Sequence, residues 1–119
     1  MAIRLFKKPT PFVIQIRATV FWQGFYNQKT RTWIGVCQAL NQNAIGDTWG
    51  ELQACANEAM QLLFADLVRT NEFDSFLREH GWTAQNSLAA ASRAPLRFDV
   101  PTDWKQQSRY EELAHSAVG

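Results

Sequence analysis

The first 46 residues contain no aspartate or glutamate, which is the most informative absence in this 119-residue sequence. That stretch holds six basic residues and so sums to +6, whereas residues 47–119 hold the other six basic residues and all eleven acids, giving 6 − 11 = −5. A charge asymmetry of this kind indicates either a polar partner surface or two solvated faces that attract each other.

Cysteine is also scarce, since Cys37 and Cys55 are the only two. Neither has the spacing of a CxxC or Cys/His metal site, and two cysteines do not make a disulfide framework. We therefore expect two small buried hydrophobic side chains and no metal site.

No apolar run is long enough to cross a membrane. Basic residues precede an apolar stretch near the N-terminus, but Pro9 and Pro11 interrupt that stretch, and Gln15 and Arg17 end the apolar run after only a few residues. A signal peptide is therefore not predicted, and we expect a cytoplasmic protein.

Catalytic motifs are missing as well. The two histidines, His80 and His115, form no HxxxH or HExxH pattern, and there is no GxSxG, P-loop or GxGxxG sequence. The paired acids Glu111 and Glu112 lie in a terminal segment typical of a solvated surface. We expect no enzyme, no catalytic residues and no cofactor.

The clearest structural pattern is an amphipathic helix over Asp47–Arg69. Thr48 is a good N-cap, and Glu51 stands at the capping-box spacing. Three- and four-residue steps place one set of apolar side chains on a single face, and a second set of residues on the other. The apolar face comprises Trp49, Leu52, Ala56, Ala59, Met60, Leu63 and Leu67, and the opposite face Glu51, Ala54, Glu58, Gln61, Ala65 and Arg69.

The residues before this helix indicate strands. Phe12–Phe25 alternates with a period of two, which sends its even-numbered residues toward the helix and its odd-numbered residues away from it. A polar turn over Tyr26–Arg31, with Asn27 as a possible left-handed residue, then leads to a second strand over Thr32–Leu40. Ala44–Gly46 is a short third strand that feeds the helix.

The later residues give weaker signals. A second helix, capped by Thr70 or Asn71, is expected to end near His80 with Gly81 after it, and its apolar face holds Phe73, Phe76 and Leu77. Residues 83–95 fit a loop, a linker or a weak helix, and Leu96–Val100 has strand character. Residues 102–119 form a polar tail or a short helix from Asp103 to His115.

Together these elements predict one α+β domain over residues 1–119, with its core at about 12–100. We expect an antiparallel three- to four-stranded sheet, packed on one face by the long helix, in the order β-β-β-α-α-β.

The order of the motifs over residues 12–82 resembles the HicB-like antitoxin family. The hairpin that ends in Thr32-Trp33-Ile34-Gly35, the helix start Gly46-Asp47-Thr48 with Glu51-Leu52, the element Asn57-Glu58-Ala59 and the pair Gly81-Trp82 carry the likeness. It implies a partial ribonuclease-H-like domain that neutralises a small mRNA-cleaving toxin, HicA, by covering its active surface.

Two features depart from that family. Asn41-Gln42-Asn43 lacks the Pro-Gly turn common in its members, and the residues after Val100 are too few for a helix-turn-helix or ribbon-helix-helix domain, so self-repression through DNA is not expected. A ribonuclease-H-type site needs clustered carboxylates beginning on the first strand, and this first strand has none.

A binding surface remains as the source of function. On the strand face away from the helix, we expect an aromatic and basic patch. It binds a protein or a second copy, stacks single-stranded RNA, or is covered by the chain's own later segments. We predict binding of a small basic HicA-like toxin by a homodimer or larger oligomer; the alternatives are a nucleic-acid-binding module and an orphan self-assembling domain. The patch comprises Arg17, Phe21, Phe25, Lys29, Arg31 and Trp33.

Overall fold

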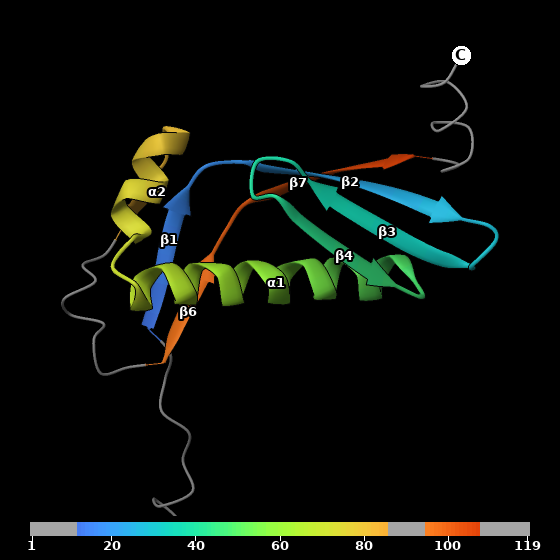
Figure 1. The fold of residues 1–119 in the computed structure, drawn as a ribbon, viewed down its shortest axis with the longest axis horizontal. Helices are drawn as coiled ribbons and strands as arrows, with labels where there is room; N and C mark the ends of the chain where they lie inside the picture. Colours follow the sequence, from blue (N-terminus) through green and yellow to red (C-terminus); the bar gives the residue numbers. More distant parts are fainter. Residues whose placement is uncertain (1–11, 86–94, 108–119) are drawn as a thin grey trace, which may run out of the picture.

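A computed structural model describes residues 12–85 and 95–107. The described chain is α+β, as predicted, with two helices and seven strands (Figure 1). In order these are β1 (Phe12–Arg17), β2 (Val20–Asn27), β3 (Thr32–Cys37), β4 (Gln42–Gly46), α1 (Trp49–Arg69), α2 (Phe73–His80), β5 (Thr83–Gln85), β6 (Leu96–Asp99) and β7 (Thr102–Gln107).

The strands form two mixed sheets rather than the single antiparallel sheet predicted. One sheet has the order β5-β1-β6 and the other the order β4-β3-β2-β7. The pairs β1–β6 and β2–β7 are parallel, and the remaining pairs are antiparallel. Parallel partners need long connections, and here the connection contains both helices. Local patterns in the sequence do not show such pairings.

The first predicted strand is divided between the two sheets by a bend at Ala18 and Thr19. Beyond the bend, the backbone N–H of Val20 donates to the carbonyl oxygen of Pro101 at 2.9 Å. The even-numbered residues Ile14, Ile16, Val20 and Trp22 are nonetheless all buried, as predicted. The bend therefore preserves the alternation of buried and exposed side chains, so the sequence pattern gives no sign that the strand bends.

The start of α1 follows the predicted capping box. The Thr48 Oγ1 accepts a hydrogen bond from the Glu51 N–H at 3.1 Å, and the Glu51 carboxylate accepts one from the Asp47 N–H at 3.1 Å. The return bond thus reaches one residue before the N-cap. Two backbone donors at the helix start are satisfied by these bonds.

The buried face of α1 is centred on a slightly different line along the helix from the apolar face that the sequence predicts. Its fully buried residues are Leu52, Ala56, Met60 and Phe64, and Phe64 was absent from the predicted stripe. Gln61, predicted on the opposite face, is instead half-buried. Its side-chain amide donates to the Phe98 carbonyl oxygen at 2.7 Å, and its Oε1 accepts from the Phe98 N–H at 2.8 Å. The glutamine thus pairs with β6 as a neighbouring strand would.

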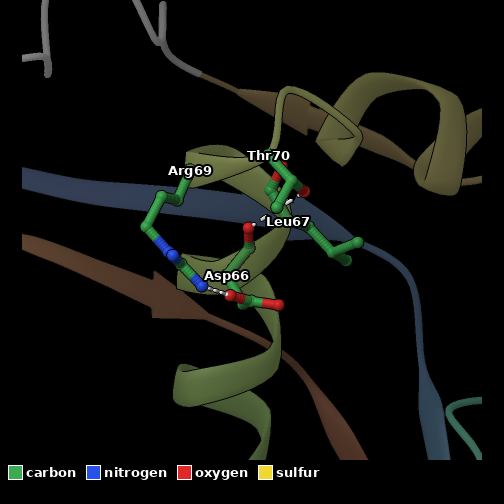
Figure 2. A network of polar contacts seen from close by, with 4 residues as sticks. All are labelled: Asp66, Leu67, Arg69 and Thr70. Carbon is green, nitrogen blue, oxygen red and sulfur yellow. Dashed lines mark hydrogen bonds and ion pairs between the residues drawn. The ribbon is translucent and has the colours of Figure 1, made fainter.

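Both helices end on a left-handed residue, Asn71 (φ 63°) after α1 and Gly81 (φ 71°) after α2. The N–H groups of Asn71 and Glu72 donate to Val68 and Leu67, which is the Schellman pattern. Thr70 closes α1 rather than starting α2, because its hydroxyl donates to the Asp66 carbonyl at 3.1 Å, and Figure 2 shows this network with the Arg69–Asp66 ion pair. Gly81 confirms the predicted end of α2.

The C-terminal elements also differ in part. Leu96–Asp99 is a strand, as predicted, whereas residues 102–107 form β7 and not the start of a helix. Of residues 83–95, Thr83–Gln85 forms β5, and residues 86–94 and 108–119 lie outside the described part of the chain. The packing of Trp104 explains why residues 102–107 form a strand. Its ring stacks on the ring of Trp22 in the neighbouring strand, with 5.3 Å between the ring centroids.

Three glycines let α1 approach the four-stranded sheet closely. A Cβ at Gly24 would lie 2.3 Å from the Trp49 ring, one at Gly35 3.0 Å from the Leu52 side chain, and one at Gly46 2.5 Å from the Leu52 backbone nitrogen. The first two are cross-strand partners on β2 and β3. Side chains at these positions would push the helix away from the sheet.

We expect Gly46→Ala to destabilise the fold by about 2 kcal/mol or more, because the added methyl group meets backbone that cannot rotate away. Gly50→Ala is the matched control, since a Cβ there meets nothing within 4 Å. It should be neutral or stabilising by up to about 1 kcal/mol. Urea unfolding of both variants measures the difference, and equal midpoints would contradict this packing.

We expect Gln61→Leu to cost about 1–3 kcal/mol, because it leaves the Phe98 N–H and carbonyl without partners in a half-buried place. Gln53→Leu on the exposed side of α1 is the control and should stay within about 0.5 kcal/mol of the original protein. Hydrogen exchange at the Phe98 amide should rise only in the first variant.

Candidate protein-binding surface

The face of the four-stranded sheet that points away from α1 is here called the outer face. Side chains alternate along β2, and Gly24 on that strand touches α1, so its neighbours Gln23 and Phe25 point outward. Residues paired across neighbouring strands point to the same face of a sheet. Phe25 pairs with Ile34 and Ile34 pairs with Ile45, so all three point to the outer face. Its apolar members are Phe21, Phe25, Ile34, Val36 and Ile45.

This face exposes large apolar side chains. Phe21 is 63 % exposed and Ile45 is 59 % exposed, while Ile34 and Val36 are half-buried. Of the two helices, α1 packs on the other side of the sheet, and α2 packs against α1 and β5. Neither helix therefore covers the outer face, so of the later segments that could have covered it, the second helix does not. Exposed apolar area of this kind is typical of a contact surface.

Two hollows flank Val36. The larger, of about 470 Å³, reaches from the outer face to α1 and is lined by Ile34, Val36, Asn43, Ala44, Ile45 and Cys55. We call it the β4 hollow. The smaller, of about 240 Å³, is lined by Phe21, Gln23, Val36, Gln38 and Ala39.

Exposed glutamates flank Cys55, the one α1 residue that lines the β4 hollow. Glu51, Cys55 and Glu58 are spaced by four and three residues on α1, so they lie along one stripe of the helix. All three are exposed, and Leu62, one further turn along the stripe, is 65 % exposed. The apolar floor of the hollow, from β3 and β4, therefore meets α1 at Cys55, and we call the stripe of α1 that carries Glu51 and Glu58 on either side of Cys55 the acidic rim.

The predicted patch is only partly assembled. Phe21 lies exposed on the outer face, and Lys29 and Arg31 are exposed in the turn between β2 and β3. Phe25 is on the same face but only 9 % exposed. Arg17 ends β1 and belongs to the other sheet, so the bend separates it from Phe21.

Trp33, predicted opposite the outward aromatics, lies on the helix face instead. Its ring meets Trp49 at 5.0 Å and Tyr26 at 5.2 Å between ring centroids. Trp49 in turn meets Trp104 at 5.3 Å, and Trp104 stacks on Trp22. These five rings fill the space between the start of α1 and the sheet, so Trp33 is part of the packing and not of the outer face.

The turn that carries the basic residues is fixed by Asn27, although not as predicted. Asn27 keeps a negative φ, and its Oδ1 accepts hydrogen bonds from the N–H groups of Lys29 at 3.0 Å and Thr30 at 3.4 Å. Arg31 takes the left-handed conformation, with φ 56°. This turn length sets the register of the hairpin and, with it, the face on which Trp33 lies.

Sequence reasoning missed Ile34, Val36 and Ile45, which make half of the lining of the β4 hollow. The available signal was the alternation of Ile34 and Val36 around Gly35, which indicates a strand with one apolar outward face. Asn43 and Ile45 alternate in the same way on β4. The acidic rim was visible as the exposed stripe Glu51–Cys55–Glu58.

His80 has a packing role in this structure. Its Nδ1 lies 2.8 Å from the Phe76 carbonyl oxygen and its Nε2 lies 2.9 Å from the Ala39 carbonyl oxygen. Its ring also lies against those of Phe76 and Trp82 in tilted contacts, with centroid distances of 4.3 and 4.5 Å. The residue therefore links α2 to the turn between β3 and β4, whereas His115 lies outside the described residues.

Within residues 12–85 and 95–107, no group of three or more His, Cys, Asp or Glu residues could hold a metal ion. No helix in those same ranges is long and apolar enough to cross a membrane. No family model, no curated protein and no solved structure matches this chain. Function is therefore inferred from the chemistry of the surface and from the resemblance of residues 12–82.

The two cysteines differ in environment, against the expectation that both are buried. Cys37 on β3 is 1 % exposed, whereas Cys55 faces solvent at the β4 hollow. Burial raises the pKa of the Cys37 thiol above its ordinary value of 9.0, and backbone hydrogen bonds from Leu40 and Ala39 offset part of that effect. The reactive thiolate is therefore disfavoured at Cys37.

We predict that a thiol reagent at pH 8 modifies one thiol per folded chain, and that Cys55→Ser abolishes this fast reaction. Cys37 should react only after unfolding in urea. Because folding raises the pKa of Cys37, its contribution to stability is complete below about pH 9 and is lost as the pH rises through the folded-state value. Absorbance of the released thiol dye gives the count, and two fast thiols in folded protein would contradict the burial of Cys37.

Proposed function

We propose that this chain is a non-enzymatic protein-binding domain that neutralises a small basic toxin of the HicA type by direct contact. The observation that carries the proposal is the β4 hollow, whose apolar floor and acidic rim suit a partner with basic side chains around an apolar patch. The resemblance of residues 12–82 to HicB-like antitoxins supplies the class of partner.

The apolar floor is the source of affinity in this proposal. Ile45 is 59 % exposed beside the half-buried Ile34, its cross-strand partner. Covering apolar surface contributes about 25 cal/mol per Å² removed from water.

The charges of the helices favour a basic partner. Residues 47–85 contain two arginines and seven acids, a sum of 2 − 7 = −5. Glu51 and Glu58 belong to this set and lie on either side of Cys55, the α1 residue that lines the hollow. A negative field steers a cationic protein toward its contact and mainly increases the association rate.

The first test is to purify the tagged full chain from its native host and identify by mass what accompanies it. A small basic protein in a fixed ratio supports the proposal, and its ribonuclease activity should disappear when this chain is added. If only RNA accompanies the chain, and its binding falls steeply as the salt concentration rises, the result would favour the nucleic-acid alternative through Lys29 and Arg31. If the chain is recovered as an oligomer with neither a small basic protein nor RNA, that result would contradict toxin neutralisation.

With that partner in hand, we predict that Ile45→Ala and Glu58→Lys each weaken binding at least tenfold, or about 1.4 kcal/mol. Ile45→Ala should act on the dissociation rate and Glu58→Lys on the association rate and its salt dependence.

Matched controls come from surfaces away from the hollow. Val13→Ala on β1 removes a comparable exposed apolar side chain, and Glu79→Lys on α2 makes the same charge change. Both should retain affinity within a factor of about three. Equal losses in controls and test variants would indicate general unfolding or a contact elsewhere, and circular dichroism separates these two outcomes.

A further inference from the structure

The two edges of the four-stranded sheet differ. At one edge, α1 packs closely on β4, and Ala44 is buried. At the other edge, β7 pairs with β2 on one side, and in the described part of the chain no strand pairs with its other side (Figure 1). An unpaired strand edge presents backbone donors and acceptors that a further strand can satisfy.

The side chains of β7 form a charge pattern that is complementary to itself. Asp103 and Lys105 both point to the outer face, because they pair with Phe21 and Gln23, whereas Trp104 between them stacks on Trp22. Both charged residues are exposed, and neither forms an ion pair with any described residue. The strand therefore carries one acid and one base, two residues apart on one face.

We propose that β7 is a self-association edge, at which a second copy of this chain adds its own β7 in antiparallel orientation about a two-fold axis at Trp104. In that register Asp103 lies opposite Lys105 of the second copy, and Lys105 lies opposite its Asp103. Opposite charges directly across an antiparallel pair stabilise it, and a two-fold contact uses each such pair twice.

The same register matches the other face of the strand. Thr102 and Gln106, both exposed, stand opposite each other across the axis and offer hydroxyl and amide groups for hydrogen bonds. The result is a continuous eight-stranded sheet with the two outer faces on one side. Its two β4 hollows lie at opposite ends, so dimer formation and toxin binding occupy different surfaces.

The contact is expected to be weak enough to be reversible. One six-residue strand from each copy makes a small interface, below the roughly 1,200 Å² of total buried area at which standard interfaces begin. We therefore expect a monomer–dimer equilibrium that depends on protein concentration, which sedimentation velocity can follow over the micromolar range.

Charge variants of the full chain test the register. In an Asp103→Lys dimer, the lysines at positions 103 and 105 of one copy face the lysines at positions 105 and 103 of the other. In a Lys105→Asp dimer, aspartates face aspartates at the same positions. Each variant alone should therefore dimerise at least tenfold more weakly. An equimolar mixture of the two should recover association as a heterodimer. The double variant D103K/K105D should recover it alone, because each lysine again meets an aspartate.

Lys29→Asp in the β2–β3 turn makes the same charge change away from β7 and should leave the dimer unchanged. Circular dichroism and tryptophan fluorescence confirm that each variant is folded. A monomer at every concentration would overturn the proposal, as would a dimer indifferent to both charge changes. If the charge variants dimerise more weakly and neither their mixture nor the double variant restores dimerisation, the proposal would also be overturned. None of these outcomes bears on toxin binding at the β4 hollow.

Discussion

The close contact between α1 and the four-stranded sheet is the constraint on which the remaining architecture depends. Gly24 and Gly35 lie side by side on β2 and β3, and the missing side chains make room for Trp49 and Leu52. Gly46 lets β4 run into the helix without a clash with its first turn. Since a helix gains most of its stability from packing an apolar face, this contact stabilises both the helix and the sheet beneath it.

The position of α1 also decides which surfaces face solvent. With its apolar side turned toward β3 and β4, the helix leaves the outer face without a cover of its own. The helical spacing then places Glu51, Cys55 and Glu58 along the exposed side beside β4. The apolar floor and the acidic rim of the β4 hollow thus come from two elements, and one packing contact brings them together.

Local signals in the sequence predicted local structure well. The capping residues Thr48 and Glu51, the ending glycine Gly81 and the buried even-numbered positions of the first strands all appear as expected. Each depends on residues close in sequence, where side-chain chemistry and period determine conformation. The burial of Phe64 was missed because the apolar face is wider than the stripe inferred for it.

The errors arise where distant segments meet. The bend at residues 18–19 keeps the alternation of the strand in phase, so no pattern marks it, and β7 was overlooked because its partner β2 lies some eighty residues earlier. Trp33 was assigned to the wrong face because odd-numbered residues on β2 pair with even-numbered residues on β3. A hairpin turn of different parity would have placed that ring on the outer face.

The unequal edges of the four-stranded sheet underlie the two different contacts that we propose for this domain. At β4, the helix screens the strand and supplies acidic side chains, so the contact offered there is made by side chains and favours a partner of opposite charge. At β7, only one side pairs with a strand among the residues that the structure describes, and the charges of Asp103 and Lys105 balance each other, so the contact proposed there is a strand pairing that favours an identical partner. Because three strand spacings of about 4.8 Å separate β4 from β7, occupation of one edge leaves the other free. A dimer would therefore carry two separate β4 hollows, and linked sites of this kind increase the apparent affinity for any partner that is itself multivalent.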